Sequence, residues 1–314
     1  MRKSLLAAAG VLSAAALVLT GCSSDSGNGD GTPTVVTSTN VWGSVASAVA
    51  GDKATVTALY TSTDGDPHEF EPSAADTATV ADADILVMNG GHYDAYMEQA
   101  AKSSDATVVD AFELAGSDEH DAGDHTDHGD AGHDHGTENE HVFYDLPVVA
   151  EVAGKIADAL SEQDPENAGT YRANAETFTS GIDGLRTELA GIRKAHDGTK
   201  VAQTEPLAGY LLTEAGLVDA APAGFTQAVE EGQSPSAADR AAMQDLLASR
   251  GVAVLIYNVQ AIDPVTQAML DVAKSSKVPV VEFTETLPDG VTDYLAWQRA
   301  QIDALAAALD TEKR

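Results

Sequence analysis

The chain contains a single cysteine, Cys22, so it cannot form an internal disulfide bond. Basic residues are also few, because 17 lysines and arginines stand against 50 acids, which gives a formal net charge of −33. A surface this negative repels phosphate backbones and concentrates cations, so nucleic acid is not expected as a partner. Solubility alone would explain the charge equally well. The 314 residues, 43% of them apolar, suffice for one large domain or two moderate ones.

A long hydrophobic run is missing as well. The apolar stretch at residues 5–19 is too short to cross a membrane comfortably. It follows a basic region at residues 1–3 and ends in small residues, which is the pattern of an export signal. We therefore expect residues 1–21 to be a signal peptide. Residues 22–33, rich in Ser, Gly and Asp, are expected to form a flexible tether without a transmembrane helix.

The end of this signal, Leu19-Thr20-Gly21-Cys22, resembles a bacterial lipobox. The resemblance implies that Cys22 carries a lipid and becomes the mature N-terminus. The protein would then be extracytoplasmic and lipid-anchored to the outer face of the bacterial cell membrane. The alternative is a free cysteine that follows a cleaved signal.

The rest of the chain alternates short β-branched or apolar segments with helix-compatible segments, which predicts an α/β fold with mostly parallel sheets. The expected strands are residues 34–39, 54–60, 84–88, 106–112, 200–204, 217–220, 252–257 and 278–283. The expected helices include residues 41–50, 73–82, 93–101, 147–162, 207–215 and 291–310.

One long helix is expected in the middle of the chain. Apolar side chains recur at spacings of three, four and seven within residues 165–195. About 30 helical residues span ~45 Å, which is long for a helix inside one α/β lobe. We therefore expect an N-terminal lobe at residues 34–160, a rigid linking helix at 161–196 and a C-terminal lobe at 197–314. A helix broken into two pieces is the alternative.

Residues 116–140 interrupt the pattern, because they are almost entirely Asp, Glu, Gly and His. Such a segment has nothing apolar to bury, so disorder is expected. Closely spaced histidines among acids favour weak, labile metal capture, and a solvated spacer is the alternative. The histidines concerned are His120, His125, His128, His133 and His135.

His68 lies between two prolines on a short loop that follows a predicted strand. Open α/β sheets bind their ligands beyond the carboxyl ends of the strands. A neutral imidazole among carboxylates can bind a divalent cation. Taken alone, the same residues would also fit a surface loop with one exposed histidine.

Five short motifs follow one another along the chain and carry a resemblance. They are Asp66-Pro67-His68-Glu69-Phe70-Glu71-Pro72, Asn89-Gly90-Gly91, Asn139-Glu140-His141-Val142-Phe143, Thr204-Glu205-Pro206-Leu207-Ala208-Gly209-Tyr210 and Phe283-Thr284-Glu285-Thr286-Leu287. With the lipobox ahead of them, they resemble the metal-binding lipoproteins, or solute-binding proteins, of bacterial ABC importers for zinc and manganese. The resemblance covers residues 34–310.

This resemblance implies two α/β lobes joined by a long rigid helix, with one metal held between the lobes. The implied ligands are His68 and His141 from the first lobe and Glu205 and Glu285 from the second. Two carboxylates neutralise a divalent ion, so the ion could be buried without uncompensated charge. Zinc-type members usually have His where Glu205 stands, and Asp is frequent where Glu285 stands. The histidine-rich segment resembles that of zinc-type members, so zinc is favoured, with manganese or iron as alternatives.

The implied partners are an ABC permease and its ATPase, and the protein is expected to be a monomer and not an enzyme. A metal-dependent hydrolase is an alternative, because His and carboxylate ligands with an open position form hydrolytic zinc sites. Neither a His-Glu-x-x-His nor a Gly-x-Ser-x-Gly motif is present in the sequence. A surface adhesin or metal store, dominated by the histidine-rich segment, is the third hypothesis. Asn258 and Gln260 follow a predicted strand and could donate hydrogen bonds to ligand carboxylates, or belong to an ordinary loop.

Overall fold

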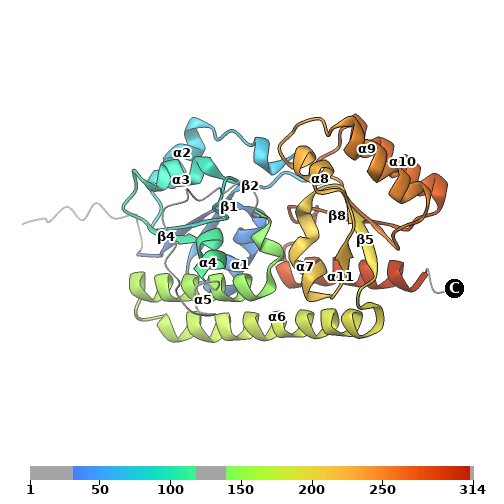
Figure 1. Ribbon diagram of the computed structural model, residues 1–314. Coiled ribbons are helices and arrows are strands. Elements are labelled where there is room, and N and C mark those ends of the chain that lie inside the picture. Colours follow the sequence, from blue (N-terminus) through green and yellow to red (C-terminus); the bar gives the residue numbers. More distant parts are fainter. Residues whose placement is uncertain (1–30, 118–138, 312–314) are drawn as a thin grey trace, which may run out of the picture. The chain divides into compact units, whose positions relative to one another are not determined.

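The computed structural model describes residues 31–117 and 139–311 of the chain (Figure 1). The predicted signal peptide, Cys22 and nearly all of the tether lie outside the described residues, as do the five histidines of the acidic segment. Within the described ranges, no helix combines the length and the apolar character needed to cross a membrane.

Two four-stranded parallel sheets organise the described part of the chain, with strand orders β2-β1-β3-β4 and β6-β5-β7-β8. The strands are β1 (Thr34–Thr39), β2 (Thr55–Tyr60), β3 (Ile85–Met88), β4 (Thr107–Asp110), β5 (Lys200–Gln203), β6 (Val218–Asp219), β7 (Leu255–Asn258) and β8 (Val280–Phe283). The predicted fold class, two α/β lobes with mostly parallel sheets, is confirmed. We call the elements around the first sheet the N-terminal lobe and those around the second the C-terminal lobe (Figure 1).

Helices flank both sheets, and short 3₁₀ turns precede several of them. The α-helices are α1 (Asn40–Ala50), α2 (Ala74–Ala81), α3 (Ala95–Ala101), α4 (Ala111–Ser117), α5 (Leu146–Gln163), α6 (Ala168–His196), α7 (Gly209–Glu214), α8 (Ala223–Glu230), α9 (Ala237–Ala248), α10 (Pro264–Ser276) and α11 (Tyr294–Thr311). The 3₁₀ turns are η1 (Pro67–Glu69), η3 (Val142–Tyr144) and η4 (Pro206–Ala208).

Two of these helices differ from the prediction. Helix α4 starts directly after β4, so the strand expected to reach residue 112 ends at Asp110. Residues 116 and 117, expected to be disordered, belong to this helix. Helix α8 occupies a stretch in which no element was predicted.

Helix α6 is one continuous helix of 29 residues. It begins at Ala168 and not at residue 161, because α5 runs to Gln163 and a turn intervenes. The Asp164 carboxylate stabilises that turn by accepting the hydroxyl proton of Tyr171 at 2.8 Å. A glycine inside a helix normally weakens it. At Gly181 the absent side chain leaves room for a terminal methyl group of Leu295 of α11, which would have to move if the residue were larger.

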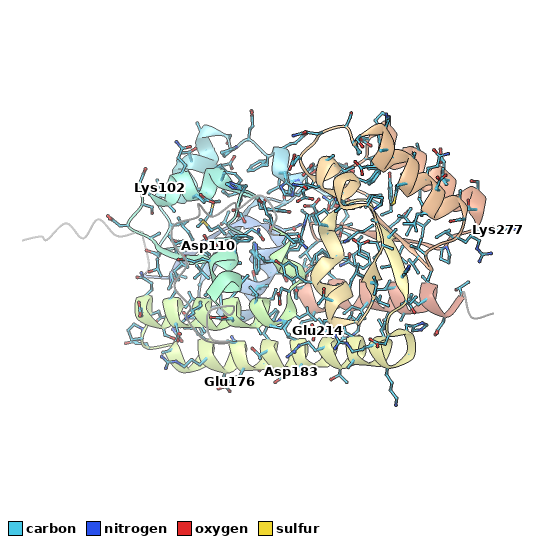
Figure 2. The ribbon with its side chains drawn as sticks, in the orientation of Figure 1. Lys102, Asp110, Glu176, Asp183, Glu214 and Lys277 are labelled. Carbon is cyan, nitrogen blue, oxygen red and sulfur yellow. The ribbon has the colours of Figure 1, made fainter. Side chains whose placement is uncertain are left out.

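The two lobes share one hydrophobic core. A single cluster of buried side chains includes Val35 and Trp42 of the N-terminal lobe and Ile256 and Phe283 of the C-terminal lobe. The buried face of α6, including Leu185, belongs to the same cluster. Acidic side chains stand on the opposite, exposed face of α6, where Figure 2 labels two of them. The helix therefore ties both lobes together through its apolar stripe.

Candidate metal centre

His68 lies on the η1 turn, just beyond β2. The Asp66 carboxylate caps this turn by accepting the backbone N–H of His68 at 2.8 Å. The proline at position 67 suits the first position of such a turn, because its missing N–H is not needed there. The His68 ring packs edge-on against Tyr93, with ring centroids 4.3 Å apart. These contacts aim the imidazole away from β2 and toward the C-terminal lobe.

His141 immediately precedes η3 and is fully buried. The side-chain oxygen of Asn139 faces both its backbone N–H, at 3.0 Å, and its Nδ1, at 2.9 Å. Because the Asn139 oxygen can only accept, Nδ1 is the nitrogen that donates here, which makes Nε2 the nitrogen available to a metal once the ring is neutral. The Asn139 amide also donates to the Pro206 carbonyl of the C-terminal lobe at 2.8 Å. One side chain thus sets the tautomer of His141 and links the two lobes.

Glu285 follows β8 and faces both imidazoles. Its Oε2 lies 3.5 Å from Nε2 of His68 and 3.4 Å from Nε2 of His141. Tyr93 donates its hydroxyl to the same oxygen at 3.0 Å. The backbone N–H of Glu285 donates to the side-chain oxygen of Gln260 at 2.7 Å. Glu285 is therefore held from several sides at the boundary between the lobes.

Glu205 lies farther from the imidazoles. It is buried between β5 and η4, and its Oε2 accepts the Asn258 amide at 2.5 Å. The same amide donates to Oε1 of Glu285 at 2.7 Å. Among the described residues, the ion pairs of His68 and His141 are with Glu230 and Glu285, and not with Glu205. Asn258 therefore positions Glu205 beside Glu285 and behind it.

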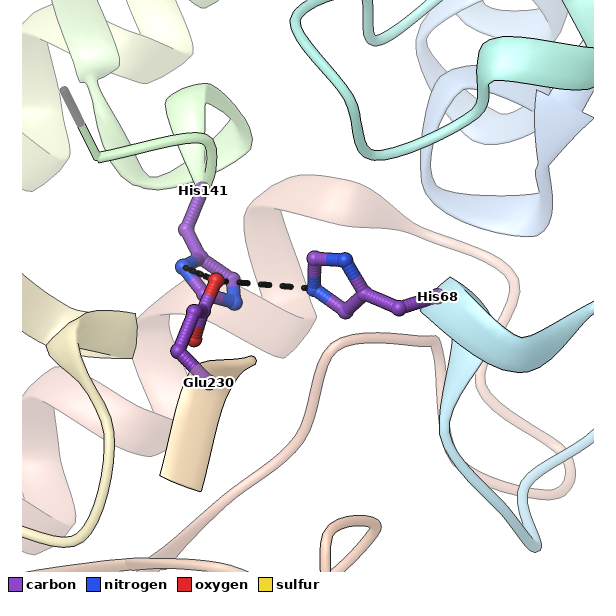
Figure 3. Close-up of side chains that lie close together, drawn as sticks. All are labelled: His68, His141 and Glu230. Carbon is purple, nitrogen blue, oxygen red and sulfur yellow. Dashed lines mark ion pairs between the residues drawn. The ribbon is translucent and has the colours of Figure 1, made fainter. Parts of the chain in front are cut away.

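Glu230, the last residue of α8, completes the group. Its Oε1 lies 3.7 Å from His68 Nε2 and 3.7 Å from His141 Nδ1, between the two rings (Figure 3). Glu230 was not predicted as a site residue, because no helix was predicted there. An acidic side chain at the carboxyl end of a helix is unfavourable and invites a functional explanation, but that end is known only from the structure. We call His68, His141, Glu230 and Glu285 the cage.

Electrostatics couple the members of the cage. Burial lowers the pKa of His68, but Glu285, Glu230 and Asp66 together outweigh it and raise that pKa to about 10. The pKa of His141 is also raised, because Glu230 and Glu285 outweigh its burial. Burial opposes ionisation of Glu285, yet the two imidazoles hold its pKa below the usual range. Before an ion binds, protonated imidazoles thus supply positive charge to the buried carboxylate.

The pKa values of two further carboxyl groups, those of Glu205 and Glu230, are shifted in the opposite direction, upward. Burial, followed by repulsion from Glu285, raises the pKa of Glu205 well above its ordinary value. Burial likewise raises the pKa of Glu230, although both imidazoles oppose that shift. Burial thus favours the neutral form of Glu205, which reduces its repulsion from ionised Glu285.

The spacing of the donors fits a small divalent cation. Around a tetrahedral ion with bonds of ~2.1 Å, neighbouring donors lie about 3.4 Å apart, since a tetrahedron's edge is about 1.63 times its centre-to-corner distance. From the Nε2 atoms, Glu285 lies 3.5 Å from His68 and 3.4 Å from His141, and Glu230 lies 3.7 Å from His68. In addition, Nε2 of His68 and Nε2 of His141 are buried without an aligned hydrogen bond. Buried imidazole nitrogens that lack such a bond are suited to binding a metal.

The fold and the cage define a class: two-lobed proteins that bring imidazoles and carboxylates together between two parallel sheets. Residues 35–308 match the sequence model of a family described as ZnuA, zinc-uptake complex component A, periplasmic. The chain belongs to this family.

Similar proteins support this assignment. Zinc-binding lipoprotein AdcA of Streptococcus pneumoniae is 27% identical over 308 residues, which cover 95% of this chain and 60% of AdcA. Manganese-binding lipoprotein MntA of Halalkalibacterium halodurans is 30% identical over 186 residues, which cover 56% of this chain and 55% of MntA. These matches therefore cover about 60% of the relatives' length or less.

Solved structures share the fold. The periplasmic zinc-binding protein TroA from Treponema pallidum has a TM-score of 0.71 and 18% identity, covering 88% of this chain and 99% of TroA. The solute-binding protein FpvC from Pseudomonas aeruginosa, in complex with Mn²⁺, has a TM-score of 0.69 and 21% identity, covering 89% of this chain and 99% of FpvC.

Proposed function

We propose that this protein is an extracytoplasmic solute-binding lipoprotein that captures one divalent transition metal between its lobes. The metal is then delivered to an ABC permease and its ATPase, while the lipid on Cys22 keeps the protein at the membrane. The observation that carries this proposal is the pair of buried Nε2 atoms, on His68 and His141, that face Glu285 at donor–donor distances suited to an ion.

The proposed ligands are His68, His141, Glu205 and Glu285. Two imidazoles and two carboxylates compensate the charge of a divalent ion in a buried place. Glu205 would lose its proton and turn from its position beside Asn258 toward the ion. Four protein ligands leave no position for a reactive water, so the site favours capture over hydrolysis.

Zinc is the favoured cargo, and two observations support it. The family that the chain belongs to is described by zinc uptake, and AdcA is named as a zinc-binding lipoprotein. Manganese is the second candidate, because MntA is named as manganese-binding and because a carboxylate, Glu205, stands at the position where zinc-type members usually have histidine. Carboxylate oxygens suit manganese better than imidazole does.

The test is the substitution His68→Ala. Structural zinc sites of four ligands bind with about 10–16 kcal/mol, so losing one ligand costs on the order of 3 kcal/mol, or about 100-fold in Kd. Calorimetric titration of chelator-treated protein with Zn²⁺ and with Mn²⁺ measures this loss. His92→Ala is the control, because His92 is exposed. Equal affinities of the His68→Ala variant and the wild type would contradict the proposed function.

A further inference from the structure

We propose that Glu230 is an additional metal donor that closes the cage on its solvent side and extends it to ions that prefer more oxygen ligands. This inference rests on the proposed function. It gives helix α8 a part in metal selection, because Glu230 is not among the four proposed ligands.

The Glu230 carboxylate lies beside both imidazole rings. Its Oε1 is 3.7 Å from Nε2 of His68, the nitrogen proposed to bind metal, and 3.7 Å from Nδ1 of His141, the nitrogen that faces Asn139 (Figure 3). The side chains of His68 and Glu230 are 19% and 18% exposed, whereas those of His141 and Glu285 are 0% and 1% exposed. His68 and Glu230 are therefore the members of the cage that solvent partly reaches, although Nε2 of His68 itself is buried. An ion that enters from this side meets the Glu230 carboxylate beside His68.

The packing of helix α8 determines the direction of the Glu230 side chain. Phe225 and Val229 of α8 are buried in the apolar cluster of the C-terminal lobe, which fixes how the helix is turned. Glu230 follows directly and points into the cage. Its neighbour Glu231 is exposed and accepts the side-chain amides of Gln227 and Gln233. Two adjacent glutamates at the unfavourable end of a helix dipole thus have different surroundings, and only Glu230 has imidazoles in reach.

Glu230 also raises the number of possible metal donors. With Glu230, the centre offers two imidazole nitrogens and three carboxylates, which is at least five donors. Closed zinc sites are almost always four-coordinate, whereas manganese accepts more ligands and prefers oxygen. A fifth donor is therefore worth more to manganese than to zinc. Glu230 broadens the range of ions that this chain holds.

The test compares Glu230→Gln with Glu231→Gln, which removes the same charge one residue away. Each variant is stripped with chelator and titrated calorimetrically with Zn²⁺ and, separately, with Mn²⁺. We expect Glu230→Gln to weaken Mn²⁺ binding by at least about tenfold, as loss of even an indirect ligand partner does, and Zn²⁺ binding by a smaller factor. Glu231→Gln is expected to match the wild type for both ions.

The outcomes separate this inference from the proposed function. If Glu230→Gln and Glu231→Gln bind both ions alike, or if Glu230→Gln weakens both ions equally, the inference is wrong. If His68→Ala weakens neither ion, the proposed function itself is wrong. Should Glu230→Gln fail to fold by circular dichroism, Glu230→Asp replaces it. This variant keeps the charge and shortens the reach by one methylene, so unchanged Mn²⁺ affinity would overturn the inference equally well.

Discussion

The two lobes have equivalent sheet topologies and opposite chemistry. Their strand orders, β2-β1-β3-β4 and β6-β5-β7-β8, correspond strand for strand, and every strand pair is parallel. Yet the proposed donors of the N-terminal lobe are nitrogen atoms, and those of the C-terminal lobe are oxygen atoms. The fold determines only that loops at the carboxyl ends of both sheets meet. Which atoms meet there depends on single residues in those loops, so neither lobe alone holds a complete site.

The largest effect is expected from removing the carboxylate that contacts both histidines. Glu285→Ala should weaken metal binding by about 100-fold or more, because it removes one ligand and leaves two imidazoles without their shared partner. Calorimetric titration measures the loss. Glu282→Ala is the matched control, since Glu282 lies on β8 close by and is exposed. If Glu285→Ala retains the metal affinity of the control, Glu285 is not a metal ligand.

The second prediction concerns the protons on His68 and His141. The pKa of His68 is raised to about 10, so this imidazole is protonated at pH 7 before an ion binds, and the pKa of His141 is raised as well. A metal needs the neutral ring, so binding must release the proton of His68. The affinity should rise with pH up to the raised pKa, and fall by about tenfold per pH unit for each proton released as pH decreases. Calorimetry of Zn²⁺ binding in buffers with different ionisation enthalpies counts the protons, and a count of zero would contradict the ion pairing described here.

The smallest effect is expected from the hydrogen bonds of Asn139, which connect His141 of the N-terminal lobe with Pro206 of the C-terminal lobe. Asn139→Ala removes the acceptor for Nδ1 of His141 and the link to Pro206. Loss of such a ligand partner typically weakens binding 10–100-fold, and we expect about tenfold. Asn139→Asp keeps the acceptor and loses only the donor to the carbonyl. It should therefore bind metal more tightly than Asn139→Ala, and equal affinities of the two variants would show that the tautomer of His141 is not set by this contact.

Much of the fold could be predicted from the sequence, because β-branched strands and amphipathic helices have local signals. The eight strands and the central helix were expected near their observed positions. The errors are local. Helix α6 starts at Ala168, whereas the linking segment was drawn from residue 161 and its helical pattern from residue 165, because Asp164 stabilises a turn at this point. The end of β4 was placed too late, because the apolar residues after Asp110 suit the start of a helix as well as a strand.

The candidate site was less predictable, because its geometry depends on contacts between distant segments. His68, His141 and Glu285 are brought together as the resemblance implied, and Glu205 is buried beside Glu285. The separation of Glu205 from the imidazoles depends on Asn258, whose single amide serves two carboxylates. Glu230 could not be assigned from sequence, because its direction depends on how α8 packs in the C-terminal lobe. Local patterns thus indicate donors, and tertiary packing selects among them.

The core that spans both lobes has a mechanical consequence. A wide hinge opening between the lobes would expose apolar side chains of α6 that are now buried, such as Phe178, Ile182 and Leu189. Each such side chain is worth about 1.5–3 kcal/mol when buried, so wide opening is expensive. Under the proposed function, the metal would instead leave by small movements near the rim, through rotation of a few side chains or displacement of the turn that carries His68. The proposed permease would need only to loosen that rim and could leave the body of the molecule closed.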